Sequence, residues 1–362
     1  MPQTSFSVYR KKNGSHLSIK LLKSLKETES WRGRSLLTLK DHTSQEIQSL
    51  INLAAVLKHK KKMRMNQHLL PGRNVVLLFE KTSTRTRCAF EVAIMDEGGH
   101  ATFLGIKDSQ FGKKESIENS AKVLGRYYDG IQFRGFDHQT VEALAQHAGV
   151  PVWNGLTDSY HPTQILADFL TISEKLNKPL NEVTFAYVGD ARNNMANSLM
   201  IGAAKMGMDF RAVAPASLFP EENLVAEMKS IAALNGGSIT LVEDPLKGVK
   251  NADVVYTDVW VSMGEEDQFE ERIKLLLPYQ VNEALMEATG KPESLFMHCL
   301  PAFHDLETQI SREVFEKYGL KELEVTDKVF RSAQSVVFDE AENRMHTIKA
   351  LMVATLGPDP VY

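Results

Sequence analysis

Several features that would define a class of protein are scarce in this chain of 362 residues. It has two cysteines, Cys88 and Cys299, which form no CxxC pair, so neither a zinc ribbon nor a disulfide framework is expected. No apolar run reaches the roughly 18 residues that a membrane-spanning helix needs. A GxGxxG fingerprint is also lacking, which argues against an NAD-dependent dehydrogenase.

The composition is that of an ordinary globular protein, with 43% hydrophobic and 24% charged residues. A chain of this length favours two domains and can bury a large core without disulfides or a structural metal. The net charge of −4 argues against a general nucleic-acid binder. We therefore expect small anions, held by local clusters of charge, as the charged partners.

The N-terminal stretch needs separate treatment, because residues 1–26 contain basic side chains and no acid. Leucines 17, 21, 22 and 25 fall at helical spacing, as in an amphipathic transit peptide. Transit peptides favour arginine, however, and this stretch has one. We therefore predict that residues 1–30 form a disordered leader, either native or added, on a cytoplasmic protein; a mitochondrial transit peptide is the alternative.

From Trp31 onward, short apolar runs alternate with helical patterns, and Thr43 with Glu46 forms a capping box ahead of the first helix. Strands are predicted at 75–79, 101–104, 130–133, 150–153, 184–188, 210–214, 239–242, 254–257 and 295–299. Helices are predicted between them, among others at 86–95, 116–127, 141–148 and 165–175, with a last one at 341–356. This alternation predicts an α/β fold of two doubly wound parallel-sheet domains.

The predicted domains are residues 31–165, joined by a C-terminal helix at 341–357, and residues 166–340. Ligands of open parallel sheets bind at the carboxyl ends of the strands. The polar clusters of this chain fall at those ends. We therefore expect the active site in the cleft between the two domains.

The strongest cluster is Ser83-Thr84-Arg85-Thr86-Arg87, directly after the first predicted strand. It combines hydroxyls and guanidinium groups with the start of a helix, where free N–H groups and the helix dipole favour anions. Arginine adds a planar fork that matches phosphate oxygens. The structural alternative is a capped helix with solvated arginines.

Two further clusters end strands of the first half. His161-Pro162-Thr163-Gln164 offers hydrogen bonds for a carbonyl oxygen and an amide, although a helix cap with a buried histidine explains it equally. Arg134 ends another predicted strand, where an ion-pair role is the usual one. Three such clusters at successive strand ends favour an anion site.

The second half has weaker signals. Residues 188–194 open a helix after a strand, Asp258 offers charge for an ammonium group, and His298-Cys299-Leu300-Pro301 ends the last strand. A lone cysteine is more often a buried inert thiol. Arg344, in the final helix, can reach an anion or simply lie on a solvated face.

Together, Ser-Thr-Arg-Thr-Arg, His-Pro-Thr-Gln and a C-terminal His-Cys-Leu-Pro resemble the carbamoyltransferase family, in order and from about Trp31 to Leu356. Aspartate carbamoyltransferases share the first two motifs but carry Pro-Leu-Pro in place of the third. The segments 258–264 and 298–305 resemble the ornithine-specific branch. The resemblance therefore implies carbamoyl transfer from carbamoyl phosphate to L-ornithine, within arginine metabolism.

The resemblance also implies residue roles. Carbamoyl phosphate would be bound by Ser83, Thr84, Arg85, Thr86, Gln110, Arg134, His161, Pro162, Thr163, Gln164, Cys299, Leu300 and Arg344. Ornithine would be bound by Asn194, Asp258, Ser262 and Met263. The catalytic set would be Arg85, Arg134, His161 and Cys299. Gln110 would reach a neighbouring subunit's site, which makes a homotrimer, or a multiple of it, the expected assembly.

The implied chemistry needs no metal, no organic cofactor and no covalent enzyme intermediate. Residues 262–268, with Gly264 as hinge, are the predicted lid. Putrescine is the nearest rival acceptor, although it lacks the α-carboxylate and α-amine of ornithine. A non-catalytic regulatory subunit on the same fold is the other alternative. The sequence leaves open whether the reaction serves arginine synthesis or breakdown.

Overall fold

The computed structural model describes residues 17–65, 68–105, 111–112, 114–261 and 268–357. The chain forms two compact units: residues 1–170 with 343–362, here called unit 1, and residues 171–342, called unit 2. The division falls at Leu170–Thr171, inside helix α6 (Pro162–Lys175), a few residues beyond the predicted boundary at 165–166. The other division precedes Asn343, two residues into the predicted C-terminal helix.

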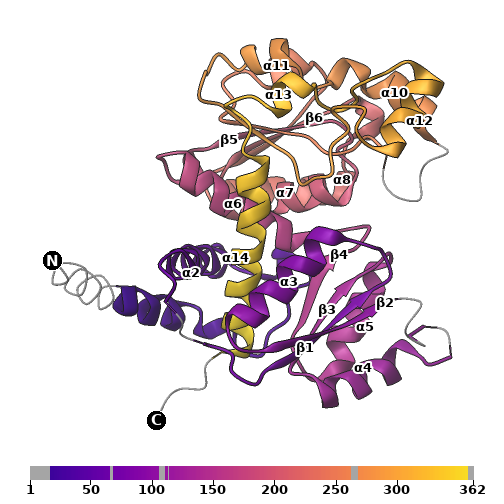
Figure 1. The fold of residues 1–362 in the computed structure, drawn as a ribbon. Helices are drawn as coiled ribbons and strands as arrows, with labels where there is room; N and C mark the ends of the chain where they lie inside the picture. The colour runs from indigo at the N-terminus through magenta and orange to yellow at the C-terminus, as the bar shows by residue number, and fades with distance from the viewer. Residues whose placement is uncertain (1–16, 66–67, 106–110, 113, 262–267, 358–362) are drawn as a thin grey trace, which may run out of the picture. The chain divides into compact units, whose positions relative to one another are not determined.

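Unit 1 contains a four-stranded sheet in the order β2-β1-β3-β4, with every pair parallel (Figure 1). Its strands are β1 (Asn74–Phe79), β2 (His100–Gly105), β3 (Gly130–Arg134) and β4 (Val152–Leu156). Its helices are α2 (Ser44–Lys62), α3 (Thr84–Asp96), α4 (Ile117–Tyr127), α5 (His138–Ala148), the first part of α6, and α14 (Val337–Leu356) from Asn343 onward. The doubly wound sheet predicted for this half is confirmed.

Alternation along the strands sends side chains to two different helical layers. Val76, Ile131 and Phe133 face α4 and α5, where they join one buried apolar cluster. On the opposite face, the ring of Trp153 lies 6.1 Å from that of Phe90 in α3, and its indole N–H donates to Thr355 in α14. The face that carries α3 and α14 also receives Gln132 and Arg134, because these residues alternate with Phe133.

Unit 2 contains a five-stranded parallel sheet in the order β7-β6-β5-β8-β9. Its strands are β5 (Thr184–Val188), β6 (Asp209–Val213), β7 (Ser238–Val242), β8 (Val254–Tyr256) and β9 (Leu295–Met297). Its helices are α7 (Asn194–Met206), α8 (Glu222–Leu234), α9 (Pro245–Gly248), α10 (Phe269–Leu276), α11 (Glu283–Glu287), α12 (Gln309–Tyr318) and α13 (Asp327–Phe330). The second predicted α/β sheet is thus also confirmed.

The strand order fixes where each sheet can bind a ligand. In unit 1 the order reverses between β1 and β3, and in unit 2 it reverses between β5 and β8. Connections leave in opposite directions at such a switch point, so a crevice opens at the carboxyl ends of the two strands. Both switch points lie at predicted polar clusters: Ser83 and Arg134 in unit 1, Gly189 and Asp258 in unit 2.

Three local predictions need correction. Residues 17–27, placed in a disordered leader, form a helix whose Leu17 and Leu21 are buried, so their periodicity outweighs the composition. Strand β4 begins at Val152, because Pro151 has no N–H for the ladder, and it continues to Leu156. Helix α14 begins at Val337 instead of 341, with Asp339 and Glu340 in the first turn, where acids are favoured.

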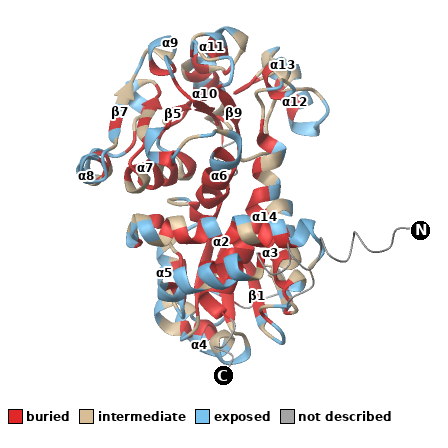
Figure 2. Cartoon of the chain, turned by 90° about the vertical axis from the view of Figure 1, so that its left-hand side faces the viewer, coloured by how far each residue is buried: buried red, intermediate tan, exposed pale blue. Residues whose placement is uncertain are grey.

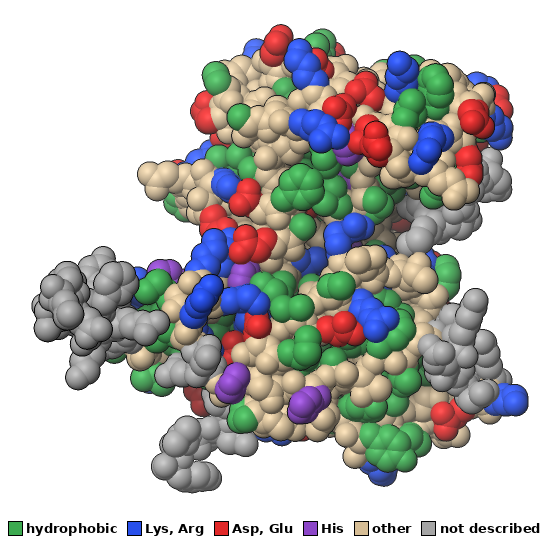
Figure 3. Space-filling view, viewed as in Figure 1, with side chains coloured by type: hydrophobic (Ala, Val, Ile, Leu, Met, Phe, Trp, Pro, Cys, Tyr) green, Lys and Arg blue, Asp and Glu red, His purple; other side chains and the backbone are tan. Residues whose placement is uncertain are grey.

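In each unit, the buried residues concentrate in the strands and in the helix faces turned toward them (Figure 2). On the surface shown in Figure 3, acidic and basic side chains intermingle on each unit, as the small net charge suggests. Among the described residues, no helix is both long enough and apolar enough to cross a membrane.

Candidate active site

The start of helix α3 organises the first cluster. Ser83 is the N-cap residue, and its Oγ accepts from the Thr86 backbone N–H at 3.3 Å and donates to Thr86 Oγ1 at 3.1 Å. Thr86 is fully buried, whereas Thr84 is exposed and Arg85 is partly buried. The predicted anion motif therefore lies at a capped helix N-terminus, where backbone N–H groups and side chains converge.

Two arginines far apart in the sequence meet at this threonine. Arg134, at the end of β3, donates to Thr86 Oγ1 at 3.3 Å, and Arg344 of α14 donates to the same oxygen at 2.8 Å. Arg344 also donates to the carbonyl oxygen of Gly155 at 3.3 Å. Both arginines are buried, at 7% and 4% exposure. Their convergence on neutral oxygens brings two cations to the switch point of unit 1.

The His-Pro-Thr-Gln segment lies against the same group. Pro162 is the first residue of α6, a position that needs no backbone N–H. Gln164 is 1% exposed, and its Oε1 accepts from Arg344 at 3.1 Å. Thr163 is also buried. Unit 1 thus brings together Ser83, Thr86, Arg134, Gln164 and Arg344.

His161 joins this cluster of unit 1 as a neutral ring. Burial, followed by the charges of Arg344, Arg134 and Arg85, holds the pKa of His161 well below 6.5. The imidazole therefore has one N–H donor and one acceptor nitrogen near pH 7. A neutral donor that lies among guanidinium groups can hydrogen-bond a carbonyl oxygen without titrating during turnover.

In unit 2, Asp258 follows strand β8 and collects several donors. Its Oδ1 accepts from the Val259 backbone N–H at 2.8 Å and from Cys299 Sγ at 3.2 Å. The amide of Asn193, the N-cap of α7, lies 3.5 Å from its Oδ2. Desolvation raises the pKa of Asp258 despite these hydrogen bonds. An ammonium ion placed beside this carboxylate would offset the desolvation.

The loop that carries Cys299 and Leu300 is held by buried acids. His298 and Glu324 are both fully buried, with 3.3 Å between His298 Nε2 and Glu324 Oε1. His298 Nδ1 accepts from the Leu300 N–H at 2.8 Å, while Glu340 accepts from the His298 N–H at 3.1 Å. Leu300 has a φ of 60° and precedes a cis proline. These contacts fix the backbone beside Cys299.

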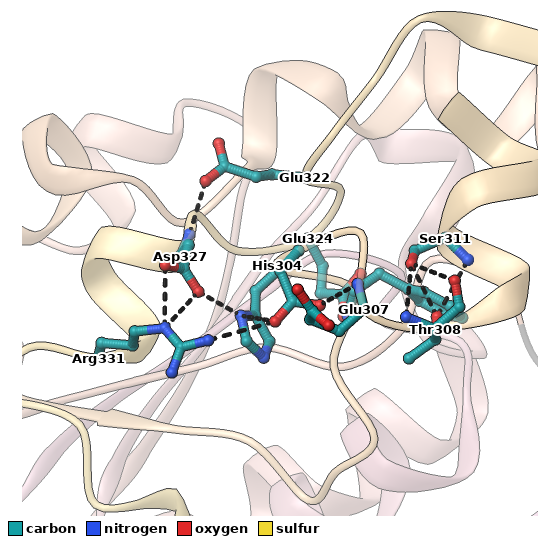
Figure 4. A network of polar contacts seen from close by, with 10 residues as sticks. His304, Glu307, Thr308, Ser311, Glu322, Glu324, Asp327 and Arg331 are labelled. Carbon is teal, nitrogen blue, oxygen red and sulfur yellow. Dashed lines mark hydrogen bonds and ion pairs between the residues drawn. The ribbon is translucent and has the colours of Figure 1, made fainter. Parts of the chain in front are cut away.

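Figure 4 shows how the same loop is fastened farther along. The Phe303 N–H donates to Glu324 at 2.7 Å, and His304 contacts Asp327 at 2.7 Å. Arg331 bonds both Asp327 and Asp305. Arg331 already neutralises the carboxylates of Asp305 and Asp327. We therefore interpret the cluster of His304, Asp305 and Asp327 as an anchor for the loop and not as a metal site.

Some predicted residues cannot be placed. Gln110, Ser262 and Met263 lie outside the described residues, as does most of the predicted lid at 262–268. Asn194, the first residue of α7, is partly buried beside the cap residue Asn193. Asp168 and Glu324 were not among the predicted site residues. Asp168 follows Gln164 by one helical turn, and this spacing could have indicated their contact. No local pattern in the sequence links Glu324 to His298.

Comparison with known proteins identifies both units. Residues 34–174 match the family model of the aspartate/ornithine carbamoyltransferase, carbamoyl-P binding domain, and residues 181–355 match that of the Asp/Orn binding domain. The chain belongs to the aspartate/ornithine carbamoyltransferase family. This confirms the family resemblance inferred from the sequence motifs.

Relatives in this carbamoyltransferase family align over nearly their whole length. The catabolic ornithine carbamoyltransferase of Bacillus licheniformis is 58% identical over 333 residues, which covers 92% of this chain and 99% of that protein. Ornithine carbamoyltransferase 1, catabolic, of Staphylococcus epidermidis is 58% identical, covering 90% and 98%. The ornithine carbamoyltransferase structure from Pyrococcus furiosus has a TM-score of 0.82 at 44% identity, covering 91% and 99%.

Proposed function

We propose that this protein transfers the carbamoyl group of carbamoyl phosphate to the δ-amine of L-ornithine, giving L-citrulline and phosphate. Relatives that are 58% identical over nearly their full length carry this activity in their names. One observation in the structure best supports carbamoyl phosphate as the substrate that supplies the carbamoyl group. Arg134 and Arg344 both donate to Thr86, which lies in the first turn of α3. A dianionic acyl phosphate suits such a cluster of hydrogen-bond donors.

In unit 1, the start of α3 and Arg85 bind the phosphate group, while Arg134 and neutral His161 donate to the carbonyl oxygen. Gln164 holds the carbamoyl amine. Donors aimed at the oxygen where negative charge develops are usually the largest source of catalysis. The remaining residues that we assign to carbamoyl phosphate are Thr84, Pro162, Thr163 and Arg344 of unit 1, Gln110 of a neighbouring subunit, and Cys299 and Leu300 of unit 2.

In unit 2, Asp258 pairs with the α-ammonium group of ornithine, and Asn194, Ser262 and Met263 hold its amino-acid end. Cys299 and Leu300 line the path of the reacting amine. The raised pKa of Asp258 supports this role, because a carboxylate with a desolvation cost gains most from a cationic ligand. Putrescine has no α-amine or α-carboxylate for this set, so ornithine is the favoured acceptor.

The chemical step begins when the δ-amine, whose pKa in water is about that of lysine, 10.4, loses a proton. The free amine attacks the carbonyl carbon, and a tetrahedral oxyanion forms beside Arg134 and His161. The C–O bond to phosphate then breaks, and the second amine proton leaves with the hydrogen phosphate product. Alignment of two bound substrates supplies much of the rate.

The test is citrulline formation from carbamoyl phosphate with L-ornithine, putrescine and L-aspartate as parallel acceptors. We expect product with ornithine alone. Carbamoylation of putrescine in preference would overturn the roles given to Asp258 and Asn194 while leaving the donor site intact. No product with any acceptor would favour a regulatory subunit.

Two finer proposals accompany this one. We infer a homotrimer, or a multiple of it, with Gln110 reaching the neighbouring site; a monomeric mass by light scattering would contradict it. We also infer a catabolic role, because both curated relatives above are named catabolic; the cytoplasm stays the location proposed from the sequence. Citrulline phosphorolysis too slow to measure would argue against that role.

A further inference from the structure

The side-chain amide of Gln164 is held at both of its ends. Its Nε2 donates to Asp168 Oδ1 at 2.9 Å, and its Oε1 accepts from the Arg344 guanidinium at 3.1 Å. All three side chains are buried, and Asp168 is fully so. Gln164 and Asp168 are four residues apart on α6, so they lie on one face of that helix.

The chemistry of the two neighbours leaves the amide only one orientation. A carboxylate accepts hydrogen bonds and does not donate, whereas a guanidinium donates and does not accept. Turning the amide over would set its NH2 group against Arg344 and its oxygen against Asp168. Both contacts would then be repulsive in a buried place, where unpaired polar groups are costly.

We propose that Asp168 is a positioning residue that makes Gln164 present its carbonyl oxygen to the bound donor substrate. This inference rests on the proposed function. A carbonyl oxygen has two lone pairs, so Gln164 Oε1 can accept from Arg344 and from one N–H of a carbamoyl group. Asp168 thereby makes the site select a carbamoyl phosphate over an acyl phosphate of the same shape.

Acetyl phosphate is the discriminating probe, because it has a methyl group where carbamoyl phosphate has an NH2 group. The phosphate group, the oxygen that bridges it to the carbonyl carbon, and the carbonyl oxygen are common to both. Only carbamoyl phosphate can donate to Gln164 Oε1. Loss of the Asp168 contact should therefore weaken carbamoyl phosphate and leave acetyl phosphate nearly unchanged.

The experiment compares the wild-type protein with Asp168→Leu and Asp168→Asn. Dissociation constants for both phosphates are taken from ligand-induced shifts in unfolding temperature, which require no turnover. We expect the preference for carbamoyl phosphate to fall about tenfold in Asp168→Leu, the scale of one hydrogen bond. Asp168→Asn should lose about threefold, because its amide oxygen can still accept from Gln164.

Asp253→Asn is the matched control, since Asp253 is a buried acid of unit 2 that pairs with Lys178 and Lys291. It should lower the unfolding temperature and leave the preference unchanged. The proposal is wrong if both phosphates weaken by the same factor in a folded Asp168 variant, or if neither weakens. If Asp168→Leu does not fold, the same comparison of the two phosphates in Asp168→Asn tests the proposal.

Failure of the proposed function has a different result. A wild-type protein that binds both phosphates but forms no citrulline would contradict carbamoyl transfer to ornithine and leave this selectivity test in place. Steady-state kinetics add a second check: Asp168→Asn should raise KM for carbamoyl phosphate and leave KM for ornithine unchanged, a split that general destabilisation would not produce.

Discussion

The two units offer opposite charges to a ligand: arginines predominate in unit 1 and carboxylates in unit 2. Both units place these groups at the switch point of a parallel sheet. In unit 1, buried Arg134 and Arg344 donate to neutral oxygens near the capped end of α3. In unit 2, acids gather around the strand ends, among them the part-buried Asp258 and the fully buried Glu324, which accept from backbone N–H groups.

Two buried histidines show the same contrast. The pKa of His161 is lowered by burial and by its arginine neighbours, whereas that of His298, although burial opposes it, is raised by Glu324, Asp258 and Glu340. Unit 1 therefore disfavours positive charge and is suited to an anion, whereas unit 2 favours positive charge and is suited to an ammonium group. Substitutions that remove one kind of charge should affect one substrate only.

The largest effect is expected from Arg85→Ala. In the proposed site Arg85 binds the phosphate group, so its removal would take one donor from the charge that develops in the transition state. We expect turnover to fall by at least ~100-fold, the scale for one oxyanion donor. Steady-state citrulline formation measures it, with exposed Arg126→Ala of α4 as control. Turnover close to that of the wild type would remove Arg85 from the site.

Asp258→Asn should have the next largest effect, and on the other substrate. The substitution keeps the shape and removes the charge, so KM for ornithine should rise about 10- to 100-fold, the range of a hydrogen bond to a charged group. The affinity for carbamoyl phosphate should stay within about twofold. Asp244→Asn, at the exposed N-cap of α9, is the matched control, because asparagine caps equally well. Weaker carbamoyl phosphate binding instead would contradict the charge division between the units.

The sequence predicted unit 1 better than unit 2 for a physical reason. Residues Ser83–Arg87 and His161–Gln164 are contiguous, and each directly follows a strand whose end lies at the sheet edge. The anion cluster could therefore be assembled from strand ends alone. Arg344 was harder to place, because its contact with Thr86 depends on the packing of α14 against the sheet.

In unit 2, the contacts that shape the site join distant segments. Glu324 reaches His298 and Phe303 across more than twenty residues, and no pattern in the sequence announces that pairing. The helix at 17–27 contradicts the predicted disordered leader for the opposite reason: its leucine spacing is visible in the sequence, but the prediction rested on the scarcity of arginine, which does not bear on helix formation. The contact of Asp168 with Gln164 could have been predicted, because the two residues are four apart on one helix.

The two histidines predict opposite dependences of stability on pH. For His161 the folded pKa is lower than the unfolded value of about 6.5, so its contribution to stability is full above that pH and falls below it. For His298 the folded pKa is higher, so its contribution is full at acid pH and is lost as pH rises through that folded value. Each can change the free energy of unfolding by up to ~1.4 kcal/mol per pH unit.

Urea unfolding between pH 5 and pH 8, a range about the ordinary histidine pKa, measures this difference. Relative to the wild type, His161→Gln should be least destabilising at pH 5 and His298→Gln least destabilising at pH 8. Exposed His59→Gln, on α2, is the control and should run parallel to the wild type. Slopes of the same sign for both variants would contradict the electrostatic contrast between the units.

The smallest effect is expected from Cys299→Ala, which removes the thiol that donates to Asp258 at 3.2 Å. A thiol is a weak donor, so the loss should be about 1 kcal/mol, or roughly fivefold in kcat/KM for ornithine. Cys299→Ser should lose less, since its hydroxyl can donate to the same carboxylate. An alanine variant that loses activity as severely as Arg85→Ala would instead support the catalytic role that the family resemblance implies for Cys299, and unit 2 would then contribute catalysis as well as binding.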